Sequence, residues 1–392
     1  MERLLAKYAG KLAAAGLTRP EDTVLGGLDA ELVWNRASPL TDPGTSPLPG
    51  LFEALNINSL LFARPAEPYR TCVDFLARES LESGRPIRPE DCETRTFLHD
   101  LPVVPDLDPA ALASALRSRK AVIVPGLGVL SFGTVSPEQA FVTYSSTLFS
   151  CFVKFFLDCL RAKDRGDFSG PRQAAFDQTL AHLPPPRTDL PILAPGPFAT
   201  EEEVYRAMDQ AGAATVGYGL VDSYFGNISY LFEDTLFISQ TGSSLDELAG
   251  AVDPCPLDGS SCAALTASSE FTAHRRVYEG TALRAILHGH PRFSVIMSMD
   301  CALADCPNLG QCHIRCDQPR FVGDIPIVPG EVGTGPTGLC NTLPPAMRER
   351  RGVLVYGHGL FAVGRRDFNE PFATLLAVEN DCRARYLARM ER

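Results

Sequence analysis

The sequence predicts an α/β protein built from two copies of one domain. Three observations lead to this prediction. A segment rich in glycine and β-branched residues occurs twice, a long helical pattern follows each copy, and a proline-rich stretch lies between the copies. Self-similarity within a chain indicates that one structural unit is repeated. The prediction therefore covers both the fold class and the number of domains.

The repeated segment is the strongest of these observations. Residues 119–133 align without gaps on residues 350–364, and the first arginine, two valines and three glycines coincide. A second match lies upstream of each segment, where residues 100–105 correspond to residues 324–329. Short strings of this kind also recur by chance in a chain with 32 glycines and 32 prolines. Because both matches keep their order, we favour duplication.

The segments that follow the repeat predict the helices and the domain boundaries. Apolar residues recur at helical spacing over about 137–165 and about 369–390. The prolines between 184 and 197 predict an extended linker. The expected organisation is a first domain at 1–183, a linker at 184–200 and a second domain at 201–392.

Composition excludes several classes of function. The chain has 392 residues with 47 acidic and 36 basic side chains, and a formal net charge of −11 disfavours binding to nucleic acid or to an anionic membrane. Charges interrupt the amino-terminal helical pattern, so it lacks the apolar core of a signal peptide. No stretch approaches the roughly 20 uncharged apolar residues that span a bilayer, and the most apolar one, 143–160, contains Lys154 and Asp158. We therefore expect a cytoplasmic protein with reduced cysteines.

Three of the seven histidines form a candidate metal site in the second copy. His288 and His290 follow an apolar run, and alternate residues of a strand point to the same face. His358 lies on the glycine turn of the repeated segment and would supply a third imidazole, leaving a coordination position open for substrate. Taken alone, the His-x-His pair is also explained as two half-exposed strand residues. The first copy has Leu127 at the place of His358.

Three small polar segments lie upstream of these histidines. Residues 268–270 are typical of a serine N-cap with an acid, Glu270, in the first turn of the following helix. A helix amino terminus is also a site for phosphate. Residues 226–229 and 241–244 are small, polar and glycine-bearing, which suits either an anion site or ordinary turns.

Taken in order, these segments resemble the class II aldolase/adducin family. The resemblance covers about 201–392, half of the chain, and the ordered set is more specific than any single piece. The fold that it implies is a three-layer α/β/α sandwich around a mainly antiparallel sheet, present twice in tandem. The resemblance rests on Gly226-Asn227-Ile228-Ser229, Thr241-Gly242, Ser268-Ser269-Glu270 with His274, His288-Gly289-His290 and His358-Gly359-Leu360.

The resemblance implies a role for each group. Glu270 would move the proton at the carbon next to the substrate carbonyl, beside Zn²⁺ or another divalent metal. The members of the family are typically tetramers, so we expect a homo-oligomer. Its substrate would be a small sugar-phosphate-like molecule, with no nucleic-acid or membrane partner. The implied metal ligands are His288, His290 and His358. The implied phosphate-binding residues are Asn227, Thr241, Gly242, Ser268 and Ser269.

The sequence departs from the aldolases at one catalytic position. In the family an active-site tyrosine precedes a Phe-Gly-Thr-like turn, whereas residues 328–334 contain no tyrosine and offer Glu331. We expect a zinc-dependent lyase that forms or cleaves a C–C bond of a small phosphorylated or carboxylated hydroxy-carbonyl compound through a metal-stabilised enediolate, with Glu270 and Glu331 as catalytic groups. A sugar-phosphate 4-epimerase or a decarboxylase using the same site stays open. A non-catalytic, adducin-like assembly protein is the third interpretation.

The first copy is expected to be a degenerate domain without metal ligands. Besides Leu127, its apparent counterpart of the His-x-His pair is Asn56-Ile57-Asn58, which cannot bind zinc in the same way. Our hypothesis is that this copy completes the active site of a neighbouring subunit or closes over it.

Four of the twelve cysteines fall within one loop after the His-x-His strand. Their spacing is C-x4-C-x5-C-x3-C, which matches no standard zinc or ferredoxin signature. One interpretation is a second metal site that holds zinc or an iron–sulfur cluster. A loop of free thiols is the other. The four residues are Cys301, Cys306, Cys312 and Cys316.

Overall fold

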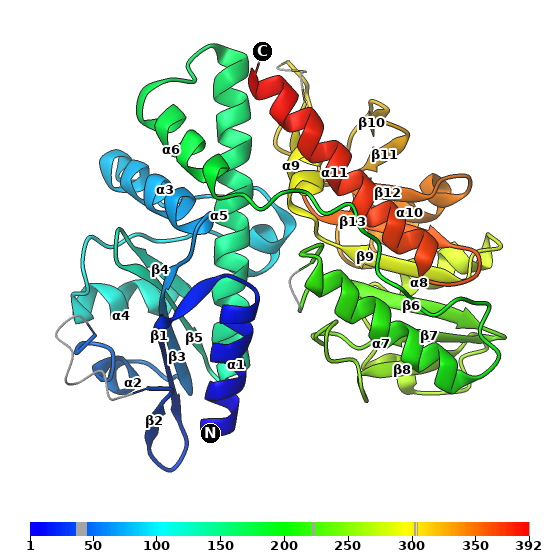
Figure 1. The fold of residues 1–392 in the computed structure, drawn as a ribbon, viewed down its shortest axis with the longest axis horizontal. Helices are drawn as coiled ribbons and strands as arrows, with labels where there is room; N and C mark the ends of the chain where they lie inside the picture. Colours follow the sequence, from blue (N-terminus) through cyan, green and yellow to red (C-terminus); the bar gives the residue numbers. More distant parts are fainter. Residues whose placement is uncertain (37–44, 222–223, 302, 304, 392) are drawn as a thin grey trace. The chain divides into compact units, whose positions relative to one another are not determined.

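The computed structural model of the chain describes residues 1–36, 45–221, 224–301, 303 and 305–391. The chain divides into two compact units, Met1–Pro184 and Pro185–Arg392. Each unit has its own sheet with helices packed against it (Figure 1). The protein is therefore an α/β protein, as the sequence predicted.

The second unit is built around an eight-stranded sheet in the order β10-β11-β12-β13-β9-β6-β7-β8. Neighbouring strands are antiparallel except β11 and β12, which run parallel. The strands are β6 (Asn227–Phe232), β7 (Thr235–Ser239), β8 (Val252–Pro256), β9 (Ala285–Gly289), β10 (Arg320–Val322), β11 (Ile325–Val328), β12 (Gly352–Val355) and β13 (Gly359–Gly364).

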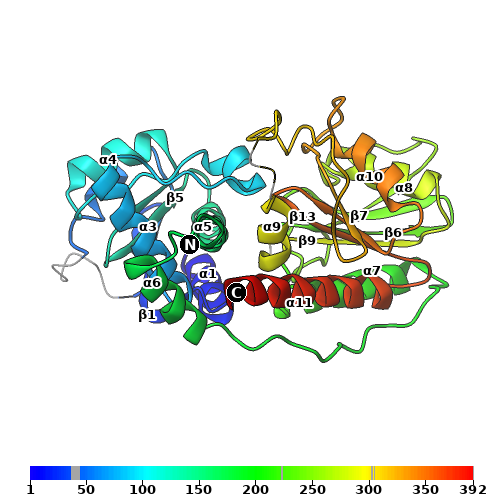
Figure 2. The ribbon, with the colours of Figure 1, turned by 90° about the horizontal axis from the view of Figure 1, so that it is seen from above.

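Helices cover both faces of this sheet and make three layers (Figure 2). One face carries α7 (Glu201–Gly217) and α11 (Asn369–Glu391), and α9 (Arg292–Met299) packs against α11. The other face carries α8 (Phe271–Glu279) and α10 (Leu339–Met347), which pack on each other. A short 3-10 helix, η3 (Ala263–Leu265), precedes α8.

The first unit has a five-stranded antiparallel sheet in the order β2-β1-β3-β5-β4. Helices α2 and α4 pack on one face, and α1, α3 and α5 contact the sheet from the other. The elements are α1 (Glu2–Ala14), β1 (Thr18–Leu28), β2 (Leu32–Trp34), α2 (Gly50–Ala54), β3 (Ser59–Pro65), α3 (Tyr69–Ser83), a π-helical turn η2 (Thr94–Leu98), α4 (Pro109–Ser118), β4 (Ala121–Val124), β5 (Gly128–Gly133), α5 (Pro137–Arg165) and α6 (Gly170–Ala181).

Helix α5 has the bounds that its apolar periodicity predicted. It is long and apolar enough to cross a membrane by length and composition, but 83% of its most apolar window is buried. It packs against α1, α3, β3 and β5. Burial of this extent is typical of the central helix of a folded domain.

The two units share one strand order. The order β2-β1-β3-β5-β4 of the first unit repeats as β7-β6-β9-β13-β12 within the second sheet. Val103 forms a parallel bridge to Ile123 of β4, where β11 runs parallel to β12 in the second unit. The second sheet extends this common arrangement by β8 at one edge and by β11 and β10 at the other.

The cores on the α2/α4 face and the α8/α10 face correspond residue by residue. The gapless alignment of the repeat places Val122, Val124, Leu130 and Phe132 on Val353, Val355, Phe361 and Val363, and each of the eight side chains lies in the core cluster of its unit. Leu60 and Ile286, at the same register in β3 and β9, also both lie in these cores. Because alternate residues of a strand face the same side of a sheet, the corresponding strands of the two units turn the same residue positions toward the core.

The segment 185–200, called the strap below, has neither helix nor strand and is bonded to the second unit. The Gly196 N–H donates to Asp367 Oδ2 at 2.8 Å, and the Arg366 guanidinium donates to the Gly196 carbonyl at 2.7 Å. A Cβ on Gly196 would lie 2.3 Å from the Arg366 carbonyl oxygen, so only glycine fits this close approach. The strap is therefore part of the second unit rather than a free linker.

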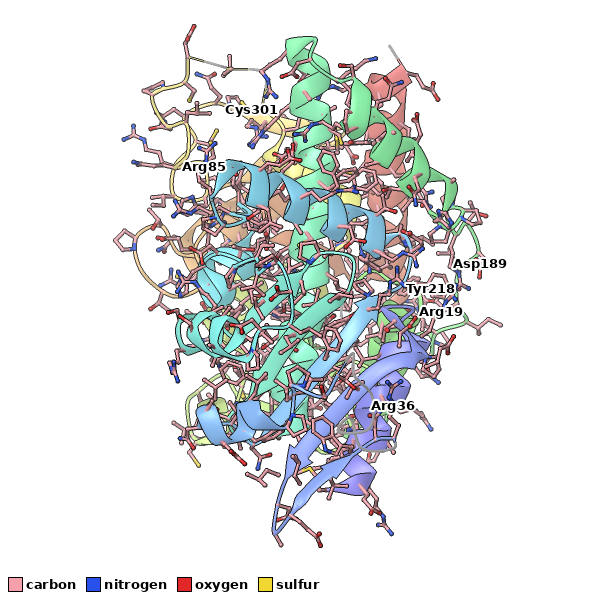
Figure 3. The ribbon with its side chains drawn as sticks, turned by 90° about the vertical axis from the view of Figure 1, so that its left-hand side faces the viewer. Arg19, Arg36, Arg85, Asp189, Tyr218 and Cys301 are labelled. Carbon is pink, nitrogen blue, oxygen red and sulfur yellow. The ribbon has the colours of Figure 1, made fainter. Side chains whose placement is uncertain are left out.

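The amino-terminal end of the strap is held by an aromatic and ionic contact. The Arg187 guanidinium lies 3.6 Å from the centre of the Tyr218 ring and pairs with Asp189 at 2.9 Å. The Tyr218 hydroxyl also donates to Asp189 at 2.9 Å, and Figure 3 shows these two side chains next to each other.

Candidate metal and active site

The sheet register brings the three predicted histidines together. β9 ends directly before His290, and Gly289 lies opposite Leu360 in the antiparallel ladder with β13. The end of β9 therefore meets the turn between β12 and β13 that carries His358. Glycine is required at the start of β13, because a Cβ on Gly359 would lie 2.3 Å from the Gly289 carbonyl oxygen and 2.9 Å from the His288 ring.

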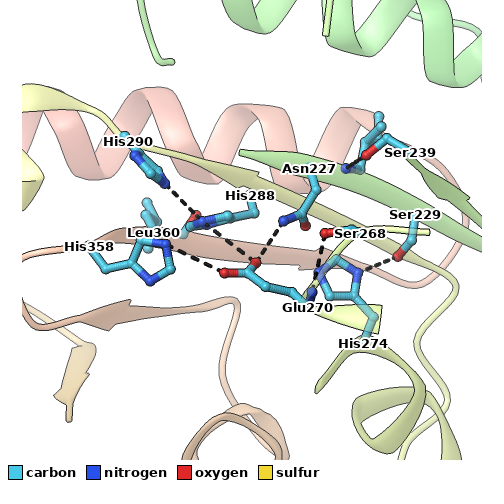
Figure 4. A network of polar contacts seen from close by, with 11 residues as sticks. Asn227, Ser229, Ser239, Ser268, Glu270, His274, His288, His290, His358 and Leu360 are labelled. Carbon is cyan, nitrogen blue, oxygen red and sulfur yellow. Dashed lines mark hydrogen bonds and ion pairs between the residues drawn. The ribbon is translucent and has the colours of Figure 1, made fainter. Parts of the chain in front are cut away.

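The three imidazoles have the geometry of a metal site. One nitrogen atom of each histidine lies within 4.8 Å of the other two, and all three side chains are buried. The Nε2 atoms of His288 and His290 are 3.1 Å apart. Three nitrogen donors that converge in this way leave room for a cation and for one exogenous ligand. Figure 4 shows the three rings around Glu270.

The orientation of His288 is fixed by two neighbours on β13. Its Nδ1 lies 3.1 Å from the Leu360 carbonyl oxygen, which accepts a hydrogen bond from the ring and turns Nε2 toward the site. The Phe361 ring stacks on the imidazole with centroids 3.7 Å apart and an interplanar angle of 8°. Burial holds the pKa of His288 and of His290 well below the ordinary value, so both rings are neutral. Phe361 was missed in the sequence, although strand pairing opposite His288 is the signal for it.

Glu270 lies within reach of two of the histidines. Its Oε1 is 3.5 Å from His358 Nε2, and its Oε2 is 3.8 Å from His288 Nε2. The Asn227 amide donates to Oε2 at 2.6 Å. Burial raises the pKa of Glu270 to about 7, and the hydrogen bond from Asn227 opposes that rise. The structure therefore gathers a buried carboxyl group and three imidazoles in one place.

The helix after Glu270 begins later than the sequence predicted. α8 starts at Phe271, so Glu270 is the N-cap residue and not a member of the first turn. Ser268 Oγ accepts a hydrogen bond from the Glu270 N–H at 3.3 Å, a local serine turn rather than a helix cap. Serine is favoured both in such turns and at helix caps, so the sequence alone does not distinguish the two structures.

The predicted phosphate-binding residues lie along one end of β6 and β7. Gln240 and Ala267 form an antiparallel bridge, which brings Thr241 beside the segment that contains Ser268. Ser268 is buried, and its N–H donates to the carbonyl of Ser239 at the end of β7 at 3.0 Å. Thr241, Gly242 and Ser269 are not buried in this way. Of the five predicted residues, Asn227 is bonded directly to Glu270.

A second polar network lies beside Glu270 in the core. Ser229 Oγ is 2.7 Å from His274 Nδ1 and 2.8 Å from the Tyr278 hydroxyl. The Tyr278 hydroxyl also lies 3.1 Å from the Ser229 carbonyl oxygen. Burial lowers the pKa of His274 to about 3. His274 is therefore a neutral residue that joins α8 to β6, as Figure 4 shows.

Glu331 is not brought into contact with the site. It is exposed, and its carboxylate accepts a hydrogen bond of 2.5 Å from the Thr337 hydroxyl within its own loop. Because β11 and β12 are parallel, the loop with Glu331 and the turn with His358 leave the same edge of the sheet. Glu331 and His358 therefore lie on loops at the same end of the sheet. Among the described residues, no bond joins Glu331 to the three histidines.

The four clustered cysteines do not gather as the histidines do. Cys301 is exposed, and Cys312 and Cys316 donate to backbone carbonyls at 3.6 Å and 3.4 Å. Within the described ranges, which omit 302 and 304 of this loop, only the three histidines form a group of at least three potential ligands within 4.8 Å. The thiols, including that of Cys306, are free.

The ladder register corrects the predicted counterpart of the His-x-His pair. Leu130 lies opposite Phe62, as Phe361 lies opposite His288. Residues 62–65 of the first unit, Phe-Ala-Arg-Pro, therefore stand where 288–291, His-Gly-His-Pro, stand in the second. Asn56-Ile57-Asn58 was the wrong choice, and the proline shared after both pairs was the signal that identifies the right one.

The remaining site positions of the first unit follow from the same register. Val24 lies opposite Phe62 where Asn227 lies opposite His288. Leu127 stands at the place of His358, as the repeat predicted, and is exposed. The first unit thus has an apolar side chain or an arginine at each position that holds an imidazole in the second unit. It also has an apolar side chain at the position of Asn227, whose amide contacts Glu270.

Comparison with known proteins defines the class of the second unit. Residues 206–386 match the sequence profile of the family described as Class II Aldolase and Adducin N-terminal domain. The matched range contains the three histidines, Glu270 and Asn227. The second unit of the chain therefore belongs to the class II aldolase/adducin family. A search of curated proteins returned no significant match to the chain.

Solved structures similar to this chain include three aldolases. L-fuculose-1-phosphate aldolase from Thermus thermophilus is 26% identical, with 48% of this chain and 96% of that chain covered and a TM-score of 0.39. A sugar-phosphate aldolase from Thermotoga maritima is 19% identical over 48% and 96%, with a TM-score of 0.35. L-fuculose 1-phosphate aldolase from Glaciozyma antarctica is 16% identical over 50% and 78%, with a TM-score of 0.37.

Proposed function

We propose that the second unit is a metal-dependent lyase of class II aldolase type. Its substrate would be a small phosphorylated or carboxylated hydroxy-carbonyl compound. The observation that supports this most strongly is the buried group of His288, His290 and His358 with a carboxyl group 3.5 and 3.8 Å from two of the imidazoles. An assembly domain has no reason to bury four such groups together, because their desolvation destabilises the fold.

The donor set suits Zn²⁺ or a similar divalent cation. Three imidazoles with one coordination position left for substrate are a catalytic rather than a structural arrangement. When bound, the cation would polarise the substrate carbonyl and stabilise the negative charge of an enediolate. The hydrogen bond from His288 Nδ1 to the Leu360 carbonyl supports the fit, since metal-binding histidines are usually oriented in this way.

Glu270 would transfer the proton at the carbon next to the carbonyl. Its Oε1 faces His358, and its Oε2 is held by the Asn227 amide at 2.6 Å. This bond fixes the carboxyl group on the side of the imidazoles, so a carbonyl compound placed there has its α-carbon within reach. Positioned carboxyl groups contribute to proton transfer through such geometry.

The anionic end of the substrate would bind at the ends of β6 and β7. The hydroxyls of Ser268 and Ser269 and the open backbone at Gly242 offer neutral donors there, and Thr241 is tied to the same segment because its hydroxyl donates to the Ala267 carbonyl at 2.9 Å. No atom lies within 4 Å of a Cβ built on Gly242, so a ligand can approach the main chain closely. Neutral hydrogen-bond donors of this kind bind either a phosphate or a carboxylate.

We infer that the first unit is a degenerate copy of the same domain. The shared strand order, the matching core positions and the register of 62–65 on 288–291 all support duplication. The copy retains the core and has none of the histidines of the site. A tandem arrangement of one active and one inactive copy accounts for the length of the chain.

Proton exchange tests the proposed chemistry. Dihydroxyacetone phosphate in D₂O, incubated with the zinc-loaded full-length protein, should exchange the proton next to its carbonyl. The Glu270→Gln variant should exchange about 10²- to 10⁴-fold more slowly, because the carboxylate that takes the proton is gone.

A matched control lies at the other end of the same helix. Glu279 is exposed and pairs with Arg275 in a salt bridge at 2.7 Å, so Glu279→Gln should exchange at the wild-type rate. Exchange at equal rates in Glu270→Gln and the wild type would remove Glu270 from the mechanism. A protein that binds metal and exchanges no proton of phosphorylated or carboxylated hydroxy-carbonyl compounds would favour the assembly function.

A further inference from the structure

The turn that carries His358 is tied to helix α9 by one buried hydroxyl. The Gly357 N–H donates to Ser298 Oγ at 2.9 Å. The same hydroxyl donates to the Val295 carbonyl at 2.7 Å, so both its donor and its acceptor functions are used. Ser298 is completely buried. The bond therefore fixes the peptide group directly before a proposed metal ligand.

Helix α9 also begins at the second ligand segment. Pro291 follows His290 and is the N-cap residue of α9. Glu379 of α11 accepts hydrogen bonds from the N–H groups of Phe293 and Ser294 at 2.9 Å and 2.8 Å. Helix α9 is thus anchored at its start just after His290, and its last turn holds the segment before His358. One short rigid element connects two of the three ligands.

The first unit holds the corresponding turn in a different way. The Gly126 N–H donates to Asp74 Oδ1 of α3 at 2.8 Å, and the turn carries the exposed Leu127. Cys72, seven residues after Pro65, stands where Ser298 stands seven residues after Pro291. Its thiol contacts Thr179 instead of the turn. The bond from a buried hydroxyl to the turn thus occurs in the unit that has the histidine.

We propose that Ser298 is a positioning residue for His358. It acts through the Gly357 N–H, which sets the place of the His358 backbone. Gly357 has a φ of 62°, in the left-handed region, so the turn has few alternative conformations once this bond is made. A ligand shifted by a fraction of an ångström binds a cation less well. The inference rests on the proposed metal centre of the second unit.

Metal affinity separates this role from general stabilisation. The probe is Co²⁺ added to the metal-free full-length protein, followed by its visible absorption. Ser298→Ala should raise the Kd for Co²⁺ about 10- to 100-fold, the usual cost of losing a group that orients a ligand. Ser298→Cys keeps nearly the same volume with a weaker acceptor, and should raise the Kd in the same direction by a smaller factor.

Thr215→Val is the matched control. Thr215 is completely buried in α7 of the same unit, and its hydroxyl donates to the Ala211 carbonyl at 2.7 Å. This variant should lower the unfolding midpoint as Ser298→Ala does, and leave the Kd unchanged.

Three outcomes would overturn the inference. An unchanged Kd in both Ser298 variants would remove the positioning role and leave the metal centre standing. An equal rise of the Kd in Thr215→Val would show general softening of the unit. Failure of the wild type to bind Co²⁺ would overturn the metal centre itself, and the inference with it.

Discussion

Three imidazoles and a carboxyl group are buried together in the second unit, and one of the imidazoles stands where the first unit buries a phenylalanine. Phe62 lies in the core of the α2/α4 face, and His288 takes the same place in the second sheet. Burying polar groups costs free energy unless hydrogen bonds compensate for it. The Leu360 carbonyl and the Asn227 amide provide part of this compensation. The site therefore lowers the stability of the second unit relative to a hydrocarbon core.

The Ser229 hydroxyl provides hydrogen bonds to two further buried polar groups, His274 and Tyr278. Ser229→Ala would leave His274 Nδ1 unsatisfied in the core and would remove one of the two hydrogen-bond partners of the Tyr278 hydroxyl. We expect a loss of about 1–3 kcal/mol in the free energy of unfolding. Urea denaturation of the metal-free variant measures it, and an unchanged midpoint would show that the network contributes no net stability.

The sequence predicted the histidines better than the groups around them. His288 and His290 follow from strand alternation, and His358 follows from comparison with Leu127 in the repeat. The pairing of Phe361 with His288 is a contact between segments far apart in sequence, so a single strand could not reveal it. Glu331 was proposed because it lies in the stretch that corresponds to the active-site tyrosine of the family, and the conformation of that loop is not encoded in a local pattern.

Helix α9 is the element that joins the ligands, and its start depends on Glu379. This carboxyl group accepts two backbone N–H groups and the Ser294 hydroxyl at 2.8 Å. Burial raises the pKa of Glu379 above its ordinary value of 4.5, while these bonds and Arg292 oppose the rise. The folded protein therefore holds the proton of Glu379 more tightly than the unfolded chain does.

This raised pKa predicts the sign of a pH effect. The stabilising contribution of protonated Glu379 is complete when the pH is below the ordinary pKa of 4.5. It declines as the pH rises through the raised pKa of the folded protein, because the folded protein must then bury a charge. Glu379→Gln cannot titrate. The stability of the wild type relative to this variant should therefore fall as pH increases from about 4 toward neutral, measured by urea denaturation. Parallel profiles for the two proteins would contradict it.

The strap is a second element whose role the sequence did not reveal. Prolines predict an extended conformation, but its docking depends on Asp367, which lies far away in the sequence. Asp367→Ala leaves the Gly196 N–H without its acceptor and should lower the free energy of unfolding by about 1–3 kcal/mol. Asp189→Asn, at the exposed end, should have little effect, because exposed ion pairs contribute little. An unfolding midpoint of Asp367→Ala equal to that of the wild type would show that the strap is not held there.

The helices and the strands differ in how well they could be predicted. α5 and α11 are long and periodic, so their bounds were evident. The strand order could not be predicted from any local segment, since it depends on pairing between residues that are distant in the sequence. β10 and β2 are only three residues long and carry too little pattern to be found. The contacts that hold the strap to the second unit are non-local as well, so the proline-rich segment alone could not reveal them.

At the scale of the whole chain, we propose that the second unit holds one metal ion and that the first unit holds none. The first unit keeps the sheet and core and has Phe62, Arg64 and Leu127 at the ligand positions. The cysteine loop keeps free thiols, two of which bond to backbone carbonyls. Assembly into a homo-oligomer stays a prediction, and so does a role of the first unit at a neighbouring active site.

The metal content of the purified full-length protein tests whether the histidines hold the one metal ion. After loading with Zn²⁺ and removal of the excess, we expect one equivalent per chain in the wild type and in Cys312→Ser. We expect none in the His288→Ala, His290→Ala double variant. Retention of the metal by the double variant, or its loss in Cys312→Ser, would show that the metal is not held by the three histidines alone.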